Sequence, residues 1–182
     1  MNTSLSLRSI AALLEETDFD FRLEQKPGLP PVILLDLDCD RLVCEIVLAS
    51  DLVPGSGAPG DDLLLLTRCA LPVEPAATND FVSLCGLVSS LFGFGALLWC
   101  ESTGVVFHRS LMAIPVGGAD ADVMERVLSQ IQLTFQATWP LLRETAAGTR
   151  TFTEARSLLA DIGFPEPALE AFPDPPDHLP FA

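Results

Sequence analysis

The fold is decided by residues 79–142, which read NDFVSLCGLVSSLFGFGALLWCESTGVVFHRSLMAIPVGGADADVMERVLSQIQLTFQATWPLL. A short apolar helix, two strands joined at 101–104 and a long amphipathic helix over 120–142 are expected here. The apolar positions of the long helix recur at four-residue steps: Val123, Val127, Ile131, Phe135 and Trp139. This spacing places them on one helical face, so we expect the helix to lie across the two strands and bury that face.

Upstream of this stretch the sequence predicts another helix and three more strands. Apolar residues at spacings of three and four predict a helix over 4–17, and residues 19–24 alternate like a short extended segment. A flexible loop rich in proline and glycine is expected over 50–62. The three strands are expected at 32–37, 41–49 and 63–71. The resulting order, α-βββ-α-ββ-α, predicts an α+β fold with an antiparallel five-stranded sheet and helices packed on it, because short turns join consecutive strands.

The composition changes near Gly148, although a length of 182 residues fits one main domain. We therefore divide the chain into an α+β domain over 1–147 and a short helix with an acidic tail over 148–182. Thr151 and Glu154 have the spacing of a capping box, which predicts the start of that helix. Six of the fifteen prolines lie beyond it, so the tail is expected to be extended or disordered.

The charge of the chain excludes one class of partner. There are 25 acidic and 10 basic residues, a net charge of −15, and Lys26 is the only lysine. Phosphate backbones need clustered basic side chains, so we expect no nucleic-acid partner. Although 49% of the residues are hydrophobic, no window reaches the roughly 18 uninterrupted apolar residues of a membrane span. We expect no association with a membrane.

The five cysteines point to a reducing compartment. Their number is odd, they form no Cys-x-x-Cys pair, and they lie within apolar patterns. Such cysteines behave as small buried hydrophobic residues, so free thiols in the cytoplasm are expected. The first residues also lack the pattern of an export signal.

One group of residues raises the possibility of catalysis. Asp36, Asp38 and Asp40 follow an apolar strand, as the metal-binding and attacking carboxylates do in haloacid-dehalogenase-type phosphatases. Such a site also needs a lysine to balance phosphate charge, and Lys26 precedes the strand. Aspartates are common in turns, so a solvated turn is the alternative reading, and the one we favour.

The remaining candidates concern contact with another polypeptide. His108 lies mid-strand without metal ligands at the usual spacing, which favours a simple sheet position. The chain offers more apolar positions than one sheet face covers, so some are expected to contact a partner or a second copy. The candidate residues for this partner or dimer surface are Leu133, Trp139, Leu141, Phe107 and Arg109.

Three segments carry a resemblance to a known family. The helix entered at Asn79-Asp80-Phe81, the strand pair over 94–109 and the helix end at Trp139-Pro140-Leu141 resemble YbjN-type proteins and class I type III secretion chaperones. The resemblance covers about Ser4 to Thr145 and includes the element order. It implies a secretion-chaperone-like fold and a homodimer that binds other proteins, with no enzymatic activity and no cofactor.

Two functional classes therefore remain after the sequence has been read. The first is a non-catalytic, chaperone-like or regulatory module that binds a partner polypeptide through apolar sheet or helix surface. In that class the acidic surface would speed encounter with the partner. The second is a metal-dependent phosphohydrolase built on Asp36, Asp38 and Asp40.

Overall fold

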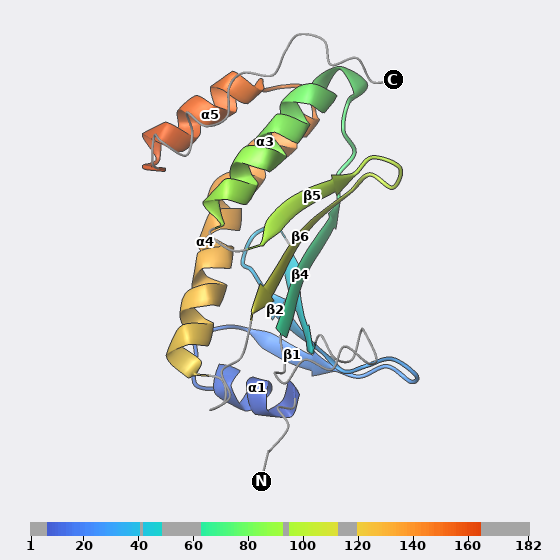
Figure 1. Ribbon diagram of the computed structural model, residues 1–182, viewed down its shortest axis with the longest axis vertical. Helices are drawn as coiled ribbons and strands as arrows, with labels where there is room; N and C mark the ends of the chain where they lie inside the picture. Colours follow the sequence, from blue (N-terminus) through green and yellow to red (C-terminus); the bar gives the residue numbers. More distant parts are fainter. Residues whose placement is uncertain (1–6, 41, 49–62, 93–94, 113–119, 165–182) are drawn as a thin grey trace. The chain divides into compact units, whose positions relative to one another are not determined.

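A computed structural model describes residues 7–40, 42–48, 63–92, 95–112 and 120–164 (Figure 1). The strands are β1 (Phe21–Glu24), β2 (Val32–Asp36), β3 (Val43–Leu48), β4 (Leu63–Ala70), β5 (Ala96–Cys100) and β6 (Val105–Met112). The helices are α1 (Leu7–Leu14), the 3-10 turn η1 (Pro75–Ala77), α3 (Thr78–Leu91), α4 (Ala121–Ala146) and α5 (Phe152–Asp161). The predicted loop over 50–62 and the tail over 165–182 lie outside the described residues.

The strands form one antiparallel six-stranded sheet with the order β1-β2-β3-β4-β6-β5. The α+β fold class is therefore confirmed, and the predicted count of five strands is wrong. The missing strand is β1, which the alternation over 19–24 identified only as an extended segment. Its four residues pair with β2 from Phe21 opposite Leu35 to Glu24 opposite Val32. Such a short strand carries little periodic signal of its own and becomes a strand through its neighbour.

Contacts divide the chain into two compact units, each built from separated segments. Unit 1 comprises residues 1–68 and 108–132, and unit 2 comprises residues 69–107 and 133–182. The strands β4 and β6 and the helix α4 pass from one unit into the other. Helix α5 packs against α3 within unit 2, and the domain boundary predicted after residue 147 stays a prediction.

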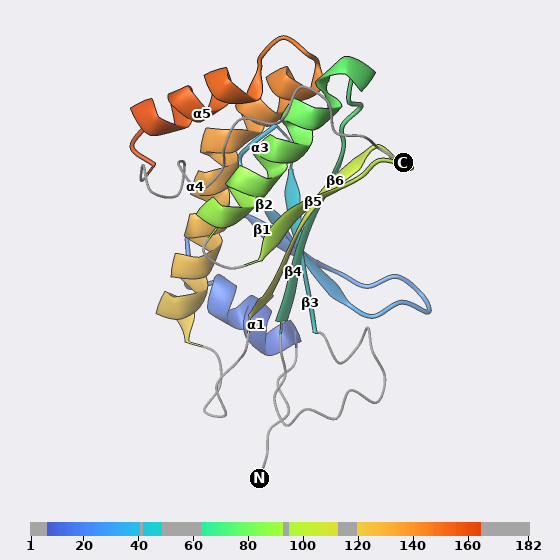
Figure 2. The same ribbon diagram turned by 45° about the horizontal axis from the view of Figure 1, so that its top comes forward.

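In unit 1, alternate residues of the strands are buried on one face of the sheet. Ile33, Leu35, Cys44, Ile46 and Leu65 are all fully buried. The registers pair Ile33 with Ile46 and Leu35 with Cys44, so these side chains share that face. Helix α1, drawn in blue near the N-terminus, packs against β2 within this unit (Figure 1 and Figure 2).

In unit 2, aromatic side chains of α3, β5 and α4 pack against one another. The ring of Phe81 meets that of Trp99 edge-on at 5.6 Å between centroids. Phe135 on α4 lies 5.2 Å from Phe92 and 6.5 Å from Trp139, again between ring centroids. These contacts confirm that Phe135 and Trp139 belong to the core of this unit.

The ends of the helices agree only in part with the sequence. The predicted capping box of α5 is present, with the Glu154 amide donating to the Thr151 hydroxyl at 3.3 Å and the Thr151 amide to the Glu154 carboxylate at 2.9 Å. The start of α3 has no side-chain cap. Ala77 is the N-cap of α3 without a side-chain bond, and the preceding turn η1 leads directly into the helix.

Helix α4 is longer and more broadly buried than its four-residue repeat predicted. It continues past Pro140 to Ala146. Val123, which begins the predicted apolar stripe, is 46% exposed, because the buried face of the first turns is set by Met124 and Leu128 instead. In unit 2 the buried positions cover a wide arc of the helix: Thr134, Phe135, Thr138, Trp139, Leu141 and Leu142.

Candidate functional site

Two chain segments are held side by side at one end of the sheet of unit 1. Residues 18–20 lie between α1 and β1, and residues 36–38 follow from the end of β2. The Asp36 amide donates to the Asp20 carbonyl at 3.0 Å, next to the pairing of Phe21 with Leu35. The β1–β2 ladder therefore brings the carboxylates of the two segments together, although they are far apart in the sequence.

The aspartate motif after β2 forms the predicted turn. The Asp38 amide donates to the Asp36 carboxylate at 2.9 Å, as in an Asx turn. Asp38 and Asp40 adopt φ of 48° and 46°, in the left-handed region that aspartate tolerates better than most residues. The turn connects the β2–β3 hairpin and leaves all three aspartates exposed.

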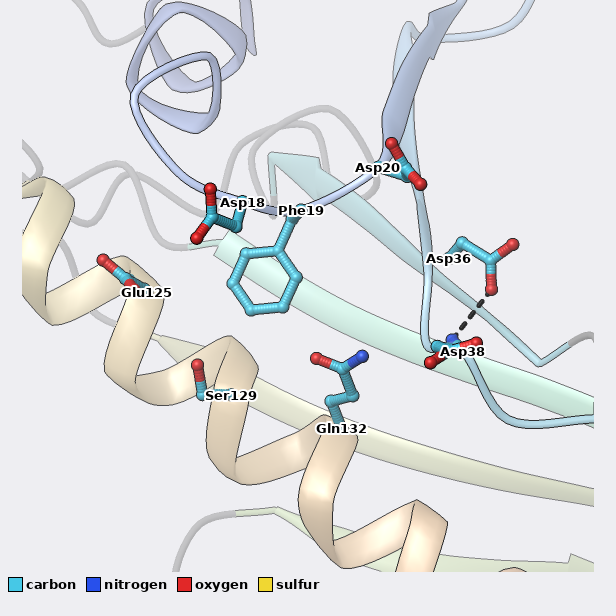
Figure 3. A pocket seen from close by; sticks show the side chains of 8 residues that line it. All are labelled: Asp18, Phe19, Asp20, Asp36, Asp38, Glu125, Ser129 and Gln132. Atoms are coloured by element: carbon cyan, nitrogen blue, oxygen red, sulfur yellow. Dashed lines mark hydrogen bonds between the residues drawn. The ribbon is translucent and has the colours of Figure 1, made fainter.

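Helix α4 supplies the opposite wall. Glu125, Ser129 and Gln132 are spaced by four and three residues, so they project from one side of the helix. Figure 3 shows these side chains on one side of the Phe19 ring, with the carboxylates of Asp20, Asp36 and Asp38 on the other. The spacing of these three polar residues is visible in the sequence, but the apolar repeat of the same helix is the stronger periodic signal.

Together these elements enclose an open cavity of about 430 Å³ that lies entirely within unit 1. Its lining comprises five carboxylates, a hydroxyl, an amide and a phenyl ring: Asp18, Asp20, Asp36, Asp38, Glu125, Ser129, Gln132 and Phe19. We call this the acidic cavity. None of its lining residues is basic, so it attracts cations and repels phosphate and other anions.

The acidic cavity matches the phosphatase motif only in part. Asp36 and Asp38 line it, whereas Asp40 does not. Across the described residues, no group of three His, Cys, Asp or Glu side chains is arranged to hold a metal ion. Lys26 is not among the lining residues either, so no lysine in the cavity balances a phosphate.

The five residues predicted for a partner or dimer surface differ widely in exposure. Leu133 is 64% exposed and Arg109 is exposed, while Phe107 is half-buried. Trp139 and Leu141 are only 3% and 8% exposed, because the wide buried arc of α4 includes both of them. These two residues therefore belong to the core and present no surface to a partner in this structure.

The thiols and the buried histidine have ordinary structural surroundings. None of the five cysteines forms a disulfide. Burial raises the pKa of both Cys44 and Cys85 to about 12. Cys100 is different, since hydrogen bonding to the Ser102 hydroxyl, at 3.3 Å, and to residue 103 lowers the pKa of its thiol. His108 is fully buried on its strand, as a sheet position predicts.

Comparison with known proteins adds no relative. No protein-family model, curated protein or solved structure matches this chain significantly. None of the helices within the described ranges is long and apolar enough to cross a lipid bilayer.

Proposed function

We propose that this protein is a non-catalytic module, chaperone-like or regulatory, that binds a polypeptide segment carrying lysine or arginine side chains. The acidic cavity is the observation that supports the proposal. It combines five carboxylates with a phenyl ring and includes no basic side chain. The resemblance to YbjN-type proteins and secretion chaperones agrees with protein binding, and five cysteines without a disulfide agree with a cytoplasmic location.

A cationic side chain fits the chemistry of this cavity. A guanidinium or ammonium group donates several hydrogen bonds to carboxylates, and such charge-assisted bonds are stronger than neutral ones. The half-buried Phe19 ring gives the same cation an aromatic face. The net charge of −15 would also accelerate the approach of a basic segment, by a factor of roughly 10 or more at low salt.

The proposal is tested with a short peptide that alternates arginine with leucine, compared with the same peptide carrying glutamate in place of arginine. Fluorescence anisotropy of the full chain should show binding of the arginine peptide alone, and binding should weaken as salt is raised. The Asp36→Asn variant keeps the oxygen that accepts from the Asp38 amide. It should bind about two- to fivefold more weakly, as expected for one exposed ion pair.

Asp161→Asn is the matched control. Asp161 is an exposed carboxylate at the end of α5 in unit 2, and its substitution changes the net charge by the same amount. This variant should bind the arginine peptide within about twofold of the wild type. Equal losses in both variants would mean that only net charge matters, and no preference for the arginine peptide would rule out the cationic partner.

A metal-dependent phosphohydrolase is the second candidate, because Asp36 and Asp38 line the same cavity. Hydrolysis of p-nitrophenyl phosphate that requires magnesium and disappears in Asp36→Asn would support it. We favour the binding function, since an anionic substrate would meet five carboxylates without a lining cation.

A further inference from the structure

Strand β1 is an edge of the sheet and lies within unit 1, directly after the segment that supplies Asp18 and Asp20 to the acidic cavity (Figure 3). The other edge strand, β5, is partly covered, because the Ser89 hydroxyl accepts a hydrogen bond from the Leu97 amide at 2.8 Å. An edge strand without such a cover can pair with an extended polypeptide. The pairing of β1 with β2 shows which backbone groups of β1 face outward.

Phe21 and Leu23 direct their backbone groups away from β2. The Asp36 amide donates to the Asp20 carbonyl at 3.0 Å, so these two residues form a hydrogen-bonded pair. Hydrogen-bonded and non-hydrogen-bonded pairs alternate along an antiparallel ladder. Arg22 therefore also bonds β2, whereas Phe21 and Leu23 occupy the alternate positions. Their amides and carbonyls point to the outer side, where no group within the described ranges bonds them.

The side chains along this edge alternate between apolar and charged. Phe21 and Leu23 lie opposite fully buried residues of β2, at the margin of the buried face of the sheet. Leu23 is 43% exposed, so an apolar neighbour on its outer side would remove it from water. The side chains of Asp20 and Arg22 point the other way by alternation, and both are exposed.

The charges at this edge favour a basic neighbour. Arg22 bonds the Glu24 carboxylate at 2.9 Å, so the two charges within β1 compensate each other. The next carboxylates along the chain, those of Asp20 and Asp18, belong to the acidic cavity. A strand paired with β1 and continuing past its first residue therefore meets negative charge.

We propose that the basic segment binds as an added antiparallel strand on the outer side of β1, an inference that rests on the proposed function. Its residues opposite Phe21 and Leu23 exchange backbone hydrogen bonds with them and carry apolar side chains. Its residue opposite Asp20 carries lysine or arginine, in a non-hydrogen-bonded pair, where opposite side chains are closest. The residue two positions further, about 6–7 Å along the strand, reaches Asp18. Alternating apolar and basic residues are therefore the pattern that this edge selects.

Two N-methylated versions of the arginine–leucine peptide test the pairing. In the added strand the N–H groups of the leucines point at β1 and those of the arginines point to solvent. Methylating the backbone nitrogens of two leucines removes donors to β1, whereas methylating those of two arginines removes none. The two peptides have the same side chains, charge and number of methyl groups. Fluorescence anisotropy with the full chain should show at least about tenfold weaker binding of the leucine-methylated peptide.

A matched pair of variants tests the same contact from the side of the protein. Leu23→Pro removes an outward amide and leaves the ladder with β2 intact, and proline is tolerated on edge strands in this position. It should bind the arginine peptide at least about fivefold more weakly. Leu23→Val keeps the amide and should bind within about twofold of the wild type. Circular dichroism establishes that both variants are folded.

Amide hydrogen exchange of the wild type followed by NMR gives a readout that needs no variant. The arginine peptide should slow exchange of the Phe21 and Leu23 amides at least about tenfold, and that of the Arg22 amide less, because it already bonds β2. Equal binding of the two methylated peptides, or no added protection of Phe21 and Leu23, would overturn the added strand and leave the cationic partner standing. Protection of both amides in the free protein would show that the edge is already occupied, with the same consequence. Failure of the arginine peptide to bind would overturn both proposals.

Discussion

The Ser89 hydroxyl on α3 hydrogen-bonds the backbone of the edge strand β5, and replacing this serine tests that contact. Strand β5 is at the end of the sheet order, so within the described residues one side of its backbone has no neighbouring strand. The Leu97 amide donates to the Ser89 hydroxyl oxygen at 2.8 Å, and this oxygen lies 3.0 Å from the Leu97 carbonyl and 2.8 Å from that of Cys85. Ser89→Ala removes these interactions and leaves the two edge groups of Leu97 without a side-chain partner.

The expected loss follows from two opposing effects. Leaving a part-buried amide and carbonyl without partners costs about 1–3 kcal/mol. Alanine is the better helix former within α3, which returns roughly 0.5 kcal/mol. We therefore expect Ser89→Ala to lower the free energy of unfolding by about 1–2 kcal/mol.

Ser90→Ala is the control that separates these effects. The Ser90 hydroxyl donates to the Leu87 carbonyl of its own helix at 2.6 Å, so its loss affects no strand. The change in helix propensity is the same, and the free energy of unfolding should stay within about 0.5 kcal/mol of the wild type. Urea denaturation followed by circular dichroism measures both variants.

Amide hydrogen exchange gives a second, local readout. The Leu97 amide should exchange faster in Ser89→Ala than in Ser90→Ala, because only the first variant removes its acceptor. If the two variants lose equal stability and the Leu97 amide is equally protected in both, the proposed role of Ser89 at the sheet edge is wrong.

Three further predictions test the burial of particular side chains. Trp139→Ala should lower the free energy of unfolding by about 3–5 kcal/mol in denaturant titrations, because it opens a cavity in the core. Leu133→Ala should change this free energy by less than about 0.5 kcal/mol. Similar losses in the two variants would contradict the core position of Trp139. In native protein Cys100 should react with iodoacetamide before Cys44 and Cys85, since its pKa is lowered while theirs are about 12. Between roughly pH 9 and 12 the unfolded chain loses thiol protons that the folded chain keeps, so the free energy of unfolding should fall as pH rises. The fall should be less steep in Cys85→Ala. Modification of Cys85 ahead of Cys100 would contradict the burial of Cys85, on which the reactivity order and the pH dependence both rest.

Most of the elements were predictable because their signals are local. The β2–β3 hairpin, the strands around the turn at 101–104, the long helix and the capping box at Thr151 all appear where periodicity or capping residues indicated them. The aspartate turn was also predictable, since aspartate favours the conformation that Asp38 and Asp40 adopt. Each of these features depends on residues only a few positions apart.

The sites were less predictable because they depend on distant neighbours. The sequence identified Asp36 and Asp38, but the pairing of β1 with β2 adds Asp18 and Asp20, and the approach of α4 adds Glu125. Nothing local to those residues indicates that they share a cavity. The exposure of apolar side chains was equally uncertain from spacing alone.

The sequence by itself determined the excess of negative charge and the order of the helices and strands apart from β1, and it predicted that the cysteines form no disulfide. Tertiary structure alone decided which side of each element is covered: it buried Trp139 and Leu141, exposed Val123 and Leu133, and gathered five carboxylates around Phe19. The physical reason is that periodicity defines the faces of an element relative to one another, whereas packing against other parts of the chain decides which face loses its water.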